Sequence, residues 1–276
     1  MSPLRQPVTI TCVIAAALTG CTTVIESANF NNRGDAYARR GDYDRAIQDF
    51  DQAIQLQPGS AFTFNNRGNA YAHKGDYDRA IQDFDQAIRL KPDYAHAFNG
   101  RGNTYVRKGD YDRAIQDFDQ AIRLKPDYME AFFDRANAYR EKGDYEHSIQ
   151  DYDRAIYLEP NDADAFSMRC WTRAVFNKEL ESALADCDES LQLRPAHADT
   201  LTRRGFVHFR MAQYDRAIAD CSASHERDPA VADPLYVRGL AERRKGDQAA
   251  GDADIAAAKA LYQNIAKVYA DYGAQP

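Results

Sequence analysis

Seven arginines and seven aspartates recur along the chain at an interval of 34 residues, broken once by an inserted residue near Lys178. The arginines are Arg33, Arg67, Arg101, Arg135, Arg169, Arg204 and Arg238. The aspartates are Asp49, Asp83, Asp117, Asp151, Asp186, Asp220 and Asp254. A guanidinium can hold both oxygens of a carboxylate, and a buried arginine needs such a partner. We interpret the two sets as a structural ladder of ion pairs, with a row of arginines that binds an anionic ligand as the alternative.

The other polar side chains give little support to catalytic or metal chemistry. The six histidines show no pairing at metal-ligand spacing, and the sequence has no glycine-rich phosphate loop or nucleophile elbow. Each Gly-Asp-Tyr-Asp segment carries two carboxylates, which suit a helix start better than acid–base catalysis or a calcium site. We expect no enzyme activity, no metal and no cofactor.

The repeating unit is predicted to be a helical hairpin. In the second unit, residues 65–74 and 78–90 have the apolar spacing of helices, and Gly75 and Asp76 separate them. This glycine suits a left-handed helix end, and the aspartate suits the cap of the next helix. Self-similarity at this period indicates stacked supersecondary units rather than one closed core.

The unit resembles the tetratricopeptide repeat. The residues that carry the resemblance are Phe64, Gly68, Tyr71, Gly75, Tyr77, Ala80, Phe84, Ala87 and Pro92. The resemblance covers seven units and implies an all-α, right-handed superhelical solenoid. The predicted units are 27–60, 61–94, 95–128, 129–162, 163–197, 198–231 and 232–262. Residues 263–276, with Ile265, Val268, Tyr269 and Tyr272 on one helical face, are predicted to form a capping helix and tail.

The N-terminus has the pattern of a targeting segment. Arg5 precedes an apolar run over 8–17, and Leu18-Thr19-Gly20-Cys21 follows it. This resembles a bacterial lipoprotein signal, which implies removal of residues 1–20, acylation of Cys21 and a short tether over 21–26. By the same resemblance, Thr22 favours the periplasmic face of the outer membrane. An ordinary signal peptide or anchor is the alternative, although the apolar run is too short to span a bilayer.

By the same family resemblance, the first helix of each hairpin lines a concave, peptide-binding face. Early units place polar side chains there: Asn31, Asp35, Asn65, Asn69, Asn99, Asn103 and Asn137. Later units place aromatic and apolar side chains there, with arginines beside them: Phe133, Trp171, Phe206, Phe209, Tyr236, Leu240, Arg140 and Arg210. Amides can bind an extended backbone, and aromatic residues and arginine dominate interface energies. A solvated polar face and packing between repeats are the alternatives.

Beyond the leader and the predicted acylation site Cys21, three cysteines remain: Cys170, Cys187 and Cys221. Each replaces a core residue of the unit, so buried thiols are expected. Cys170 and Cys187 lie at facing positions of one hairpin, which leaves a disulfide between them as the alternative.

These features predict a membrane-anchored periplasmic scaffold that binds other proteins or peptides. A net charge of −7 without a basic block argues against nucleic acid as the partner. A structural module that forms homo-oligomers is one alternative. An accessory factor for envelope, pilus or peptidoglycan assembly is another.

Overall fold

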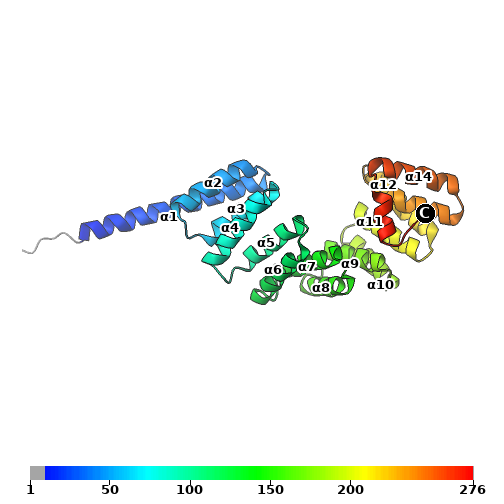
Figure 1. Ribbon diagram of the computed structural model, residues 1–276, viewed down its shortest axis with the longest axis horizontal. Helices are drawn as coiled ribbons and strands as arrows, with labels where there is room; N and C mark the ends of the chain where they lie inside the picture. The colour runs from blue at the N-terminus through cyan, green and yellow to red at the C-terminus, as the bar shows by residue number, and fades with distance from the viewer. Residues whose placement is uncertain (1–9, 276) are drawn as a thin grey trace, which may run out of the picture. The chain divides into compact units, whose positions relative to one another are not determined.

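The computed structural model describes residues 10–275, with side chains from Thr22 onward. The first nine residues of the predicted leader and the side chains of Cys12 and Cys21 lie outside this description. Over the described range the chain forms fifteen α-helices and no strand (Figure 1). Their bounds are α1 (Ile10–Arg39), α2 (Tyr43–Leu56), α3 (Ala61–His73), α4 (Tyr77–Leu90), α5 (Ala95–Arg107), α6 (Tyr111–Leu124), α7 (Met129–Glu141), α8 (Tyr145–Leu158), α9 (Ala163–Phe176), α10 (Leu180–Leu193), α11 (Ala198–Arg210), α12 (Tyr214–Arg227), α13 (Asp233–Lys245), α14 (Gln248–Leu261) and α15 (Ile265–Asp271). The all-α class predicted from the sequence is confirmed.

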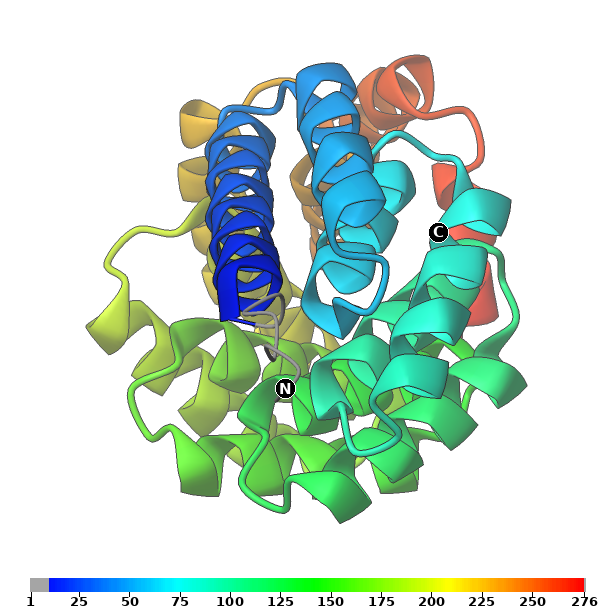
Figure 2. The ribbon, with the colours of Figure 1, turned by 90° about the vertical axis from the view of Figure 1, so that its left-hand side faces the viewer.

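Consecutive helices pair as hairpins, and the chain divides into two compact units. The N-terminal unit extends to Ala131 and the C-terminal unit starts at Phe132. In the N-terminal unit α1 packs on α2, α3 on α4 and α5 on α6, and Figure 2 shows α1 and α2 lying side by side. In the C-terminal unit α9 packs on α10, α11 on α12 and α13 on α14. Within each unit the first helices of successive hairpins also touch, as α3 and α5 do.

The turn inside five of the seven hairpins is set by a glycine followed by an aspartate, whereas the sixth hairpin has Ala212 and Gln213 at these positions. Gly75 has a φ of 82°, a left-handed value that glycine adopts at little cost. The Asp76 carboxylate then accepts a hydrogen bond from the Arg79 backbone N–H and caps α4. Such a cap contributes about 1 kcal/mol to helix stability. The predicted roles of this glycine and aspartate are confirmed.

The fifth hairpin absorbs the inserted residue in its turn. Asn177 and Glu179 both have left-handed backbone, with φ of 56° and 54°. No glycine stands here, but asparagine tolerates this conformation better than other side chains do. The helices on either side keep their register, and Arg169 still reaches Asp186, 17 residues away instead of 16.

Phe84 shows how neighbouring hairpins are joined in the N-terminal unit. Its side chain is fully buried between two glycines of successive first helices. A Cβ on Gly68 would lie 3.1 Å from the Phe84 ring, and one on Gly100 would lie 2.5 Å from it. These positions must therefore be small for the ring to be held between the hairpins.

The N-terminal helix is longer than the predicted first repeat. α1 runs without a break from Ile10 to Arg39 and includes residues 21–26, where a tether is expected. Among the helices described, none is both long enough and apolar enough to cross a membrane.

Candidate functional site

The structure brings every arginine of the predicted ladder to its aspartate. In each of the seven hairpins the arginine Nε and Nη2 donate to the two carboxylate oxygens of one aspartate, over 2.5–3.0 Å. The hydrogen bond to Asp117 raises the pKa of the Arg101 guanidinium above its usual value, so Arg101 stays charged at any physiological pH. The pairs link the two helices of one hairpin, and the bidentate contact occupies the guanidinium edge that an anionic ligand would need.

A second set of carboxylates extends this ladder between hairpins. The Nη1 of Arg67 donates to Asp51, on the second helix of the preceding hairpin, over 2.5 Å. Three further arginines make the same contact over 2.5–2.7 Å, namely Arg101 with Asp85, Arg169 with Asp153 and Arg204 with Asp188. In the last hairpin Arg238 donates instead to the hydroxyl of Ser222. These aspartates follow the same 34-residue period as the arginines, although they were not predicted to pair with them.

The row of amides does not form one exposed surface. Asn69 is exposed and Asn103 is half-buried, but Asn65 and Asn99 are only 6% and 7% exposed. Asn31, also buried, accepts a hydrogen bond from Asn66 of the next hairpin. The expectation that these amides face a ligand is therefore wrong for Asn31, Asn65 and Asn99, because their side chains are buried.

The predicted aromatic surface lies in the C-terminal unit, and much of it is covered. Phe206, Tyr236 and Leu240 are at most 1% exposed, so the expectation that they line an open groove is wrong. Trp171, Phe209, Phe133 and Arg210 are half-buried. Asn137 and Arg140 lie on α7, where Asn137 accepts a hydrogen bond from Tyr152 and Arg140 pairs with Glu141.

The cover is the C-terminal helix α15. Trp171, Phe206 and Tyr236, from α9, α11 and α13, form a surface that we call the aromatic groove. The Tyr269 ring of α15 lies 6.4 Å from Trp171, 5.4 Å from Phe206 and 5.0 Å from Tyr236, between ring centres. Tyr269 is completely buried, and its hydroxyl donates to Asp233 over 3.0 Å. The predicted cap thus reaches beyond the last hairpin and contacts three first helices.

Two arginines hold the chain that follows α15. Arg210 donates to the backbone carbonyls of Tyr272 and Gly273, and its guanidinium lies 4.9 Å from the centre of the Phe206 ring. Arg244 donates to the carbonyl of Gln275 over 3.4 Å. We call residues 265–275 the tail. Burial lowers the pKa of Arg210. Its hydrogen bonds within the described chain go to backbone carbonyls of the tail and not to a carboxylate.

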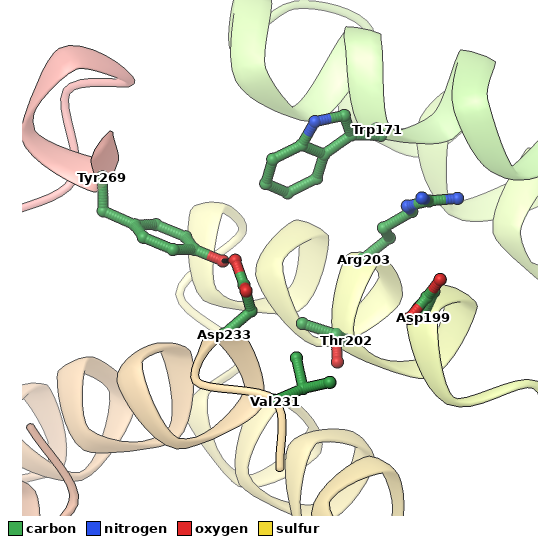
Figure 3. A pocket seen from close by; sticks show the side chains of 7 residues that line it. All are labelled: Trp171, Asp199, Thr202, Arg203, Val231, Asp233 and Tyr269. Carbon is green, nitrogen blue, oxygen red and sulfur yellow. Dashed lines mark hydrogen bonds between the residues drawn. The ribbon is translucent and has the colours of Figure 1, made fainter. Parts of the chain in front are cut away.

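A cavity of about 270 Å³ opens beside the tail (Figure 3). The side chains that line it are Trp171, Asp199, Thr202, Arg203, Val231, Asp233 and Tyr269. In Figure 3 these side chains surround one space and come from α9, α11, α13, α15 and the segment before α13, and the Tyr269 hydroxyl lies against Asp233. Arg203 donates to the Ser167 hydroxyl, and burial lowers its pKa. Burial likewise raises the pKa of Asp233, against the opposing effect of the Tyr269 hydrogen bond. Arg203, Asp199 and Asp233 are groups that sequence reasoning did not assign.

Two of the three cysteines expected to be free thiols are bonded to each other. Cys170 and Cys187 form a disulfide, with their Cα atoms 5.5 Å apart, so the expectation of two free thiols is wrong. Their positions on the facing helices α9 and α10 meet the distance requirement. Cys221 is a free, buried thiol as expected. Among the described residues, no group of three or more His, Cys, Asp or Glu side chains is placed to hold a metal ion.

Two repeat-family models match the chain. A model described as "TPR repeat" matches residues 34–75 and 68–109, and a model described as "Tetratricopeptide repeat" matches residues 99–165. The comparison with curated proteins yields no match.

Solved structures with similar folds are repeat proteins of this type. A tetratricopeptide repeat protein from Parabacteroides merdae is 16% identical, with a TM-score of 0.68 over 90% of this chain and 98% of that one. PilW, a type IV pilus biogenesis factor, is 20% identical, with a TM-score of 0.68 over 74% and 94%. YrrB, described as having an unusual peptide-binding site, is 23% identical, with a TM-score of 0.55 over 65% and 92%. At sequence identities this low, the similarity shows a shared fold and not a shared function.

Proposed function

The chain is a tetratricopeptide repeat protein, and we propose that it acts as a membrane-anchored periplasmic scaffold that binds peptide segments of other proteins. The repeat is a fold used for protein–protein interaction, and the similar structures include one with a peptide-binding site and one of a pilus biogenesis factor. A scaffold function requires a surface that accepts a segment of polypeptide. The C-terminal unit offers such a surface, because the first helices α9, α11 and α13 together hold the helical tail.

The aromatic groove carries this proposal. Aromatic side chains and arginine supply most of the binding energy at protein interfaces, and both types meet here around a partly open cavity. Trp171 is the half-buried member of the groove and lines the cavity. It can therefore contact a bound segment without being part of the fully buried core.

Replacing Trp171 with alanine is expected to reduce capture of periplasmic partner proteins at least tenfold, because it removes the largest exposed contact of the groove. The measurement is affinity capture with the purified chain, followed by quantitative mass spectrometry. The matched control is Tyr157→Ala, which removes an aromatic side chain that is 72% exposed on the second helix α8. Equal capture by the Trp171→Ala variant and the unchanged chain would contradict the assignment of the site.

The membrane anchor is a separate part of the proposal and rests on the sequence 18–21. If Cys21 is acylated, Cys21→Ser is expected to move the protein from the membrane fraction to the soluble periplasmic fraction. Several acyl chains on one residue hold a protein on a membrane, whereas a single chain gives only marginal binding. Metabolic labelling with an alkyne-modified fatty acid should label the unchanged chain and leave the variant unlabelled. Label that persists in Cys21→Ser would rule out this anchor.

A further inference from the structure

The tail is bound through the kinds of contact that a peptide ligand would make. Its helix α15 has only seven residues, too few to be stable alone in water, so its helical form depends on the groove. Two side chains three positions apart, Tyr269 and Tyr272, pack against Trp171. The backbone carbonyls of Tyr272 and Gly273 accept hydrogen bonds from Arg210. The three residues between α14 and α15 keep the tail near the groove.

The positive charge of Arg210 has no negatively charged partner in its contact with the tail. In the C-terminal unit, each half-buried arginine other than Arg203 and Arg210 forms an ion pair with a carboxylate within the described chain. The tail offers Arg210 only neutral carbonyls, which form weaker hydrogen bonds with a guanidinium than a carboxylate does. A carboxylate at this place would therefore bind better than the tail.

Gly273 marks where such a carboxylate would lie. A Cβ at this position would stand 4.0 Å from Nη1 of Arg210. The backbone there is left-handed, with a φ of 74°, a conformation that aspartate and asparagine adopt more readily than most other side chains. An aspartate directly after the second aromatic residue would thus have its carboxylate within reach of Arg210, at the cost of some backbone strain at this left-handed position.

We propose that the tail is an intramolecular ligand of the aromatic groove, and that the natural partner is a helical segment with two aromatic residues three positions apart followed by an aspartate. This inference rests on the proposed scaffold function and adds both the partner's chemistry and a form of control. A tethered ligand competes at a high effective concentration, so only a segment with better contacts displaces it. The ion pair to Arg210 supplies that difference, because a ligand shifts an equilibrium only by its differential affinity.

The test uses the full chain and labelled peptides of residues 263–276. In the chain variant Tyr269→Ala the tail loses its buried anchor while the aromatic groove stays intact. This variant is expected to bind the tail peptide at least tenfold more tightly than the unchanged chain does. The matched peptides Gly273→Asp and Gly273→Asn differ in charge alone, and the aspartate form is expected to bind at least tenfold more tightly. That difference is expected to disappear when the chain also carries Arg210→Gln.

A second measurement needs no variant of the chain. In hydrogen–deuterium exchange of the unchanged protein, the Gly273→Asp peptide is expected to speed exchange of the α15 backbone amides and leave those of α9 and α10 unchanged. A purely structural cap predicts the opposite, namely protection of α15 that no peptide alters.

Several results would overturn the inference. They are a folded Tyr269→Ala chain that binds no tail peptide, equal binding of the aspartate and asparagine peptides, and undisturbed α15 exchange at saturating peptide. A dimer that forms in proportion to chain concentration and exchanges its tails would assign the groove to a second copy instead. If the Trp171→Ala capture result holds while the peptides fail, the scaffold function stands and only this inference falls. If Trp171→Ala leaves partner capture unchanged and the peptides bind as expected, the tail is a ligand of the groove but the captured proteins bind elsewhere.

Discussion

Replacing Phe206 with alanine is expected to lower the free energy of unfolding by about 3–5 kcal/mol, the usual cost of removing a fully buried phenylalanine ring. Phe206 has no exposed surface and contacts Trp171 on α9 and Tyr269 on α15, with ring centres 5.3 and 5.4 Å apart. Its loss would leave a void between the groove and the tail that the rigid helices cannot close completely. The measurement is denaturant unfolding followed by the fluorescence of Trp171, the single tryptophan of the chain.

Phe62→Ala is the matched control, since this ring is 55% exposed. Its removal is expected to change the unfolding free energy by less than about 0.5 kcal/mol. A cost below about 1 kcal/mol for Phe206→Ala would mean that the tail does not cover this ring in solution. The two stability values therefore also check the packing on which the tail inference depends.

Removing the guanidinium of Arg101 is expected to cost about 3 kcal/mol, because the buried carboxylate of Asp117 would then lack its partner. Asp117 is 6% exposed, and Arg101 also holds Asp85 of the preceding hairpin. Arg101→Ala thus breaks one link inside a hairpin and one between hairpins. Thermal and urea unfolding, both followed by circular dichroism, would measure the loss.

Arg33→Ala provides the comparison within the same ladder. The Arg33 side chain is 59% exposed and, among the described residues, forms an ion pair with Asp49 alone, whereas the Arg101 side chain is 20% exposed and pairs with two aspartates. Solvent weakens an exposed ion pair, so the cost is expected to stay below about 1 kcal/mol. Equal loss of unfolding free energy in both variants would show that burial does not determine how much these ion pairs stabilise the protein.

Local sequence signals predicted the hairpins well. The left-handed glycine and the capping aspartate at Gly75 and Asp76 act within a few residues, so the sequence alone locates them. The pairing of Arg101 with Asp117 follows from a spacing of 16 residues that recurs in every unit except the fifth, where it is 17. The same period also contains Asp85, but only the stacking of hairpins shows that it lies against the same guanidinium.

The candidate site was harder to predict because it depends on contacts between distant parts of the chain. Phe206 lies at a position of the repeat where a groove residue is expected. It is buried because Tyr269, more than sixty positions later in the chain, packs against it. Arg210 and Tyr272 are separated by 62 residues, and no local pattern connects them. Predicting the Cys170–Cys187 disulfide requires knowing that the two cysteines face each other and that they are oxidised. The spacing in the sequence indicates that they face each other but says nothing about their oxidation state.

The symmetry of the arginine contacts bears on how this chain can change in length. Arg67 reaches Asp51 and Asp83, which lie 16 residues before it and 16 residues after it. Arg101 reaches Asp85 and Asp117 at the same two offsets. Where the 34-residue spacing is regular, copying or deleting a block of 34 residues therefore regenerates such a junction with its partners in place. Gene segments of this kind can recombine unequally and still encode complete junctions, so the number of hairpins can evolve without compensating point mutations.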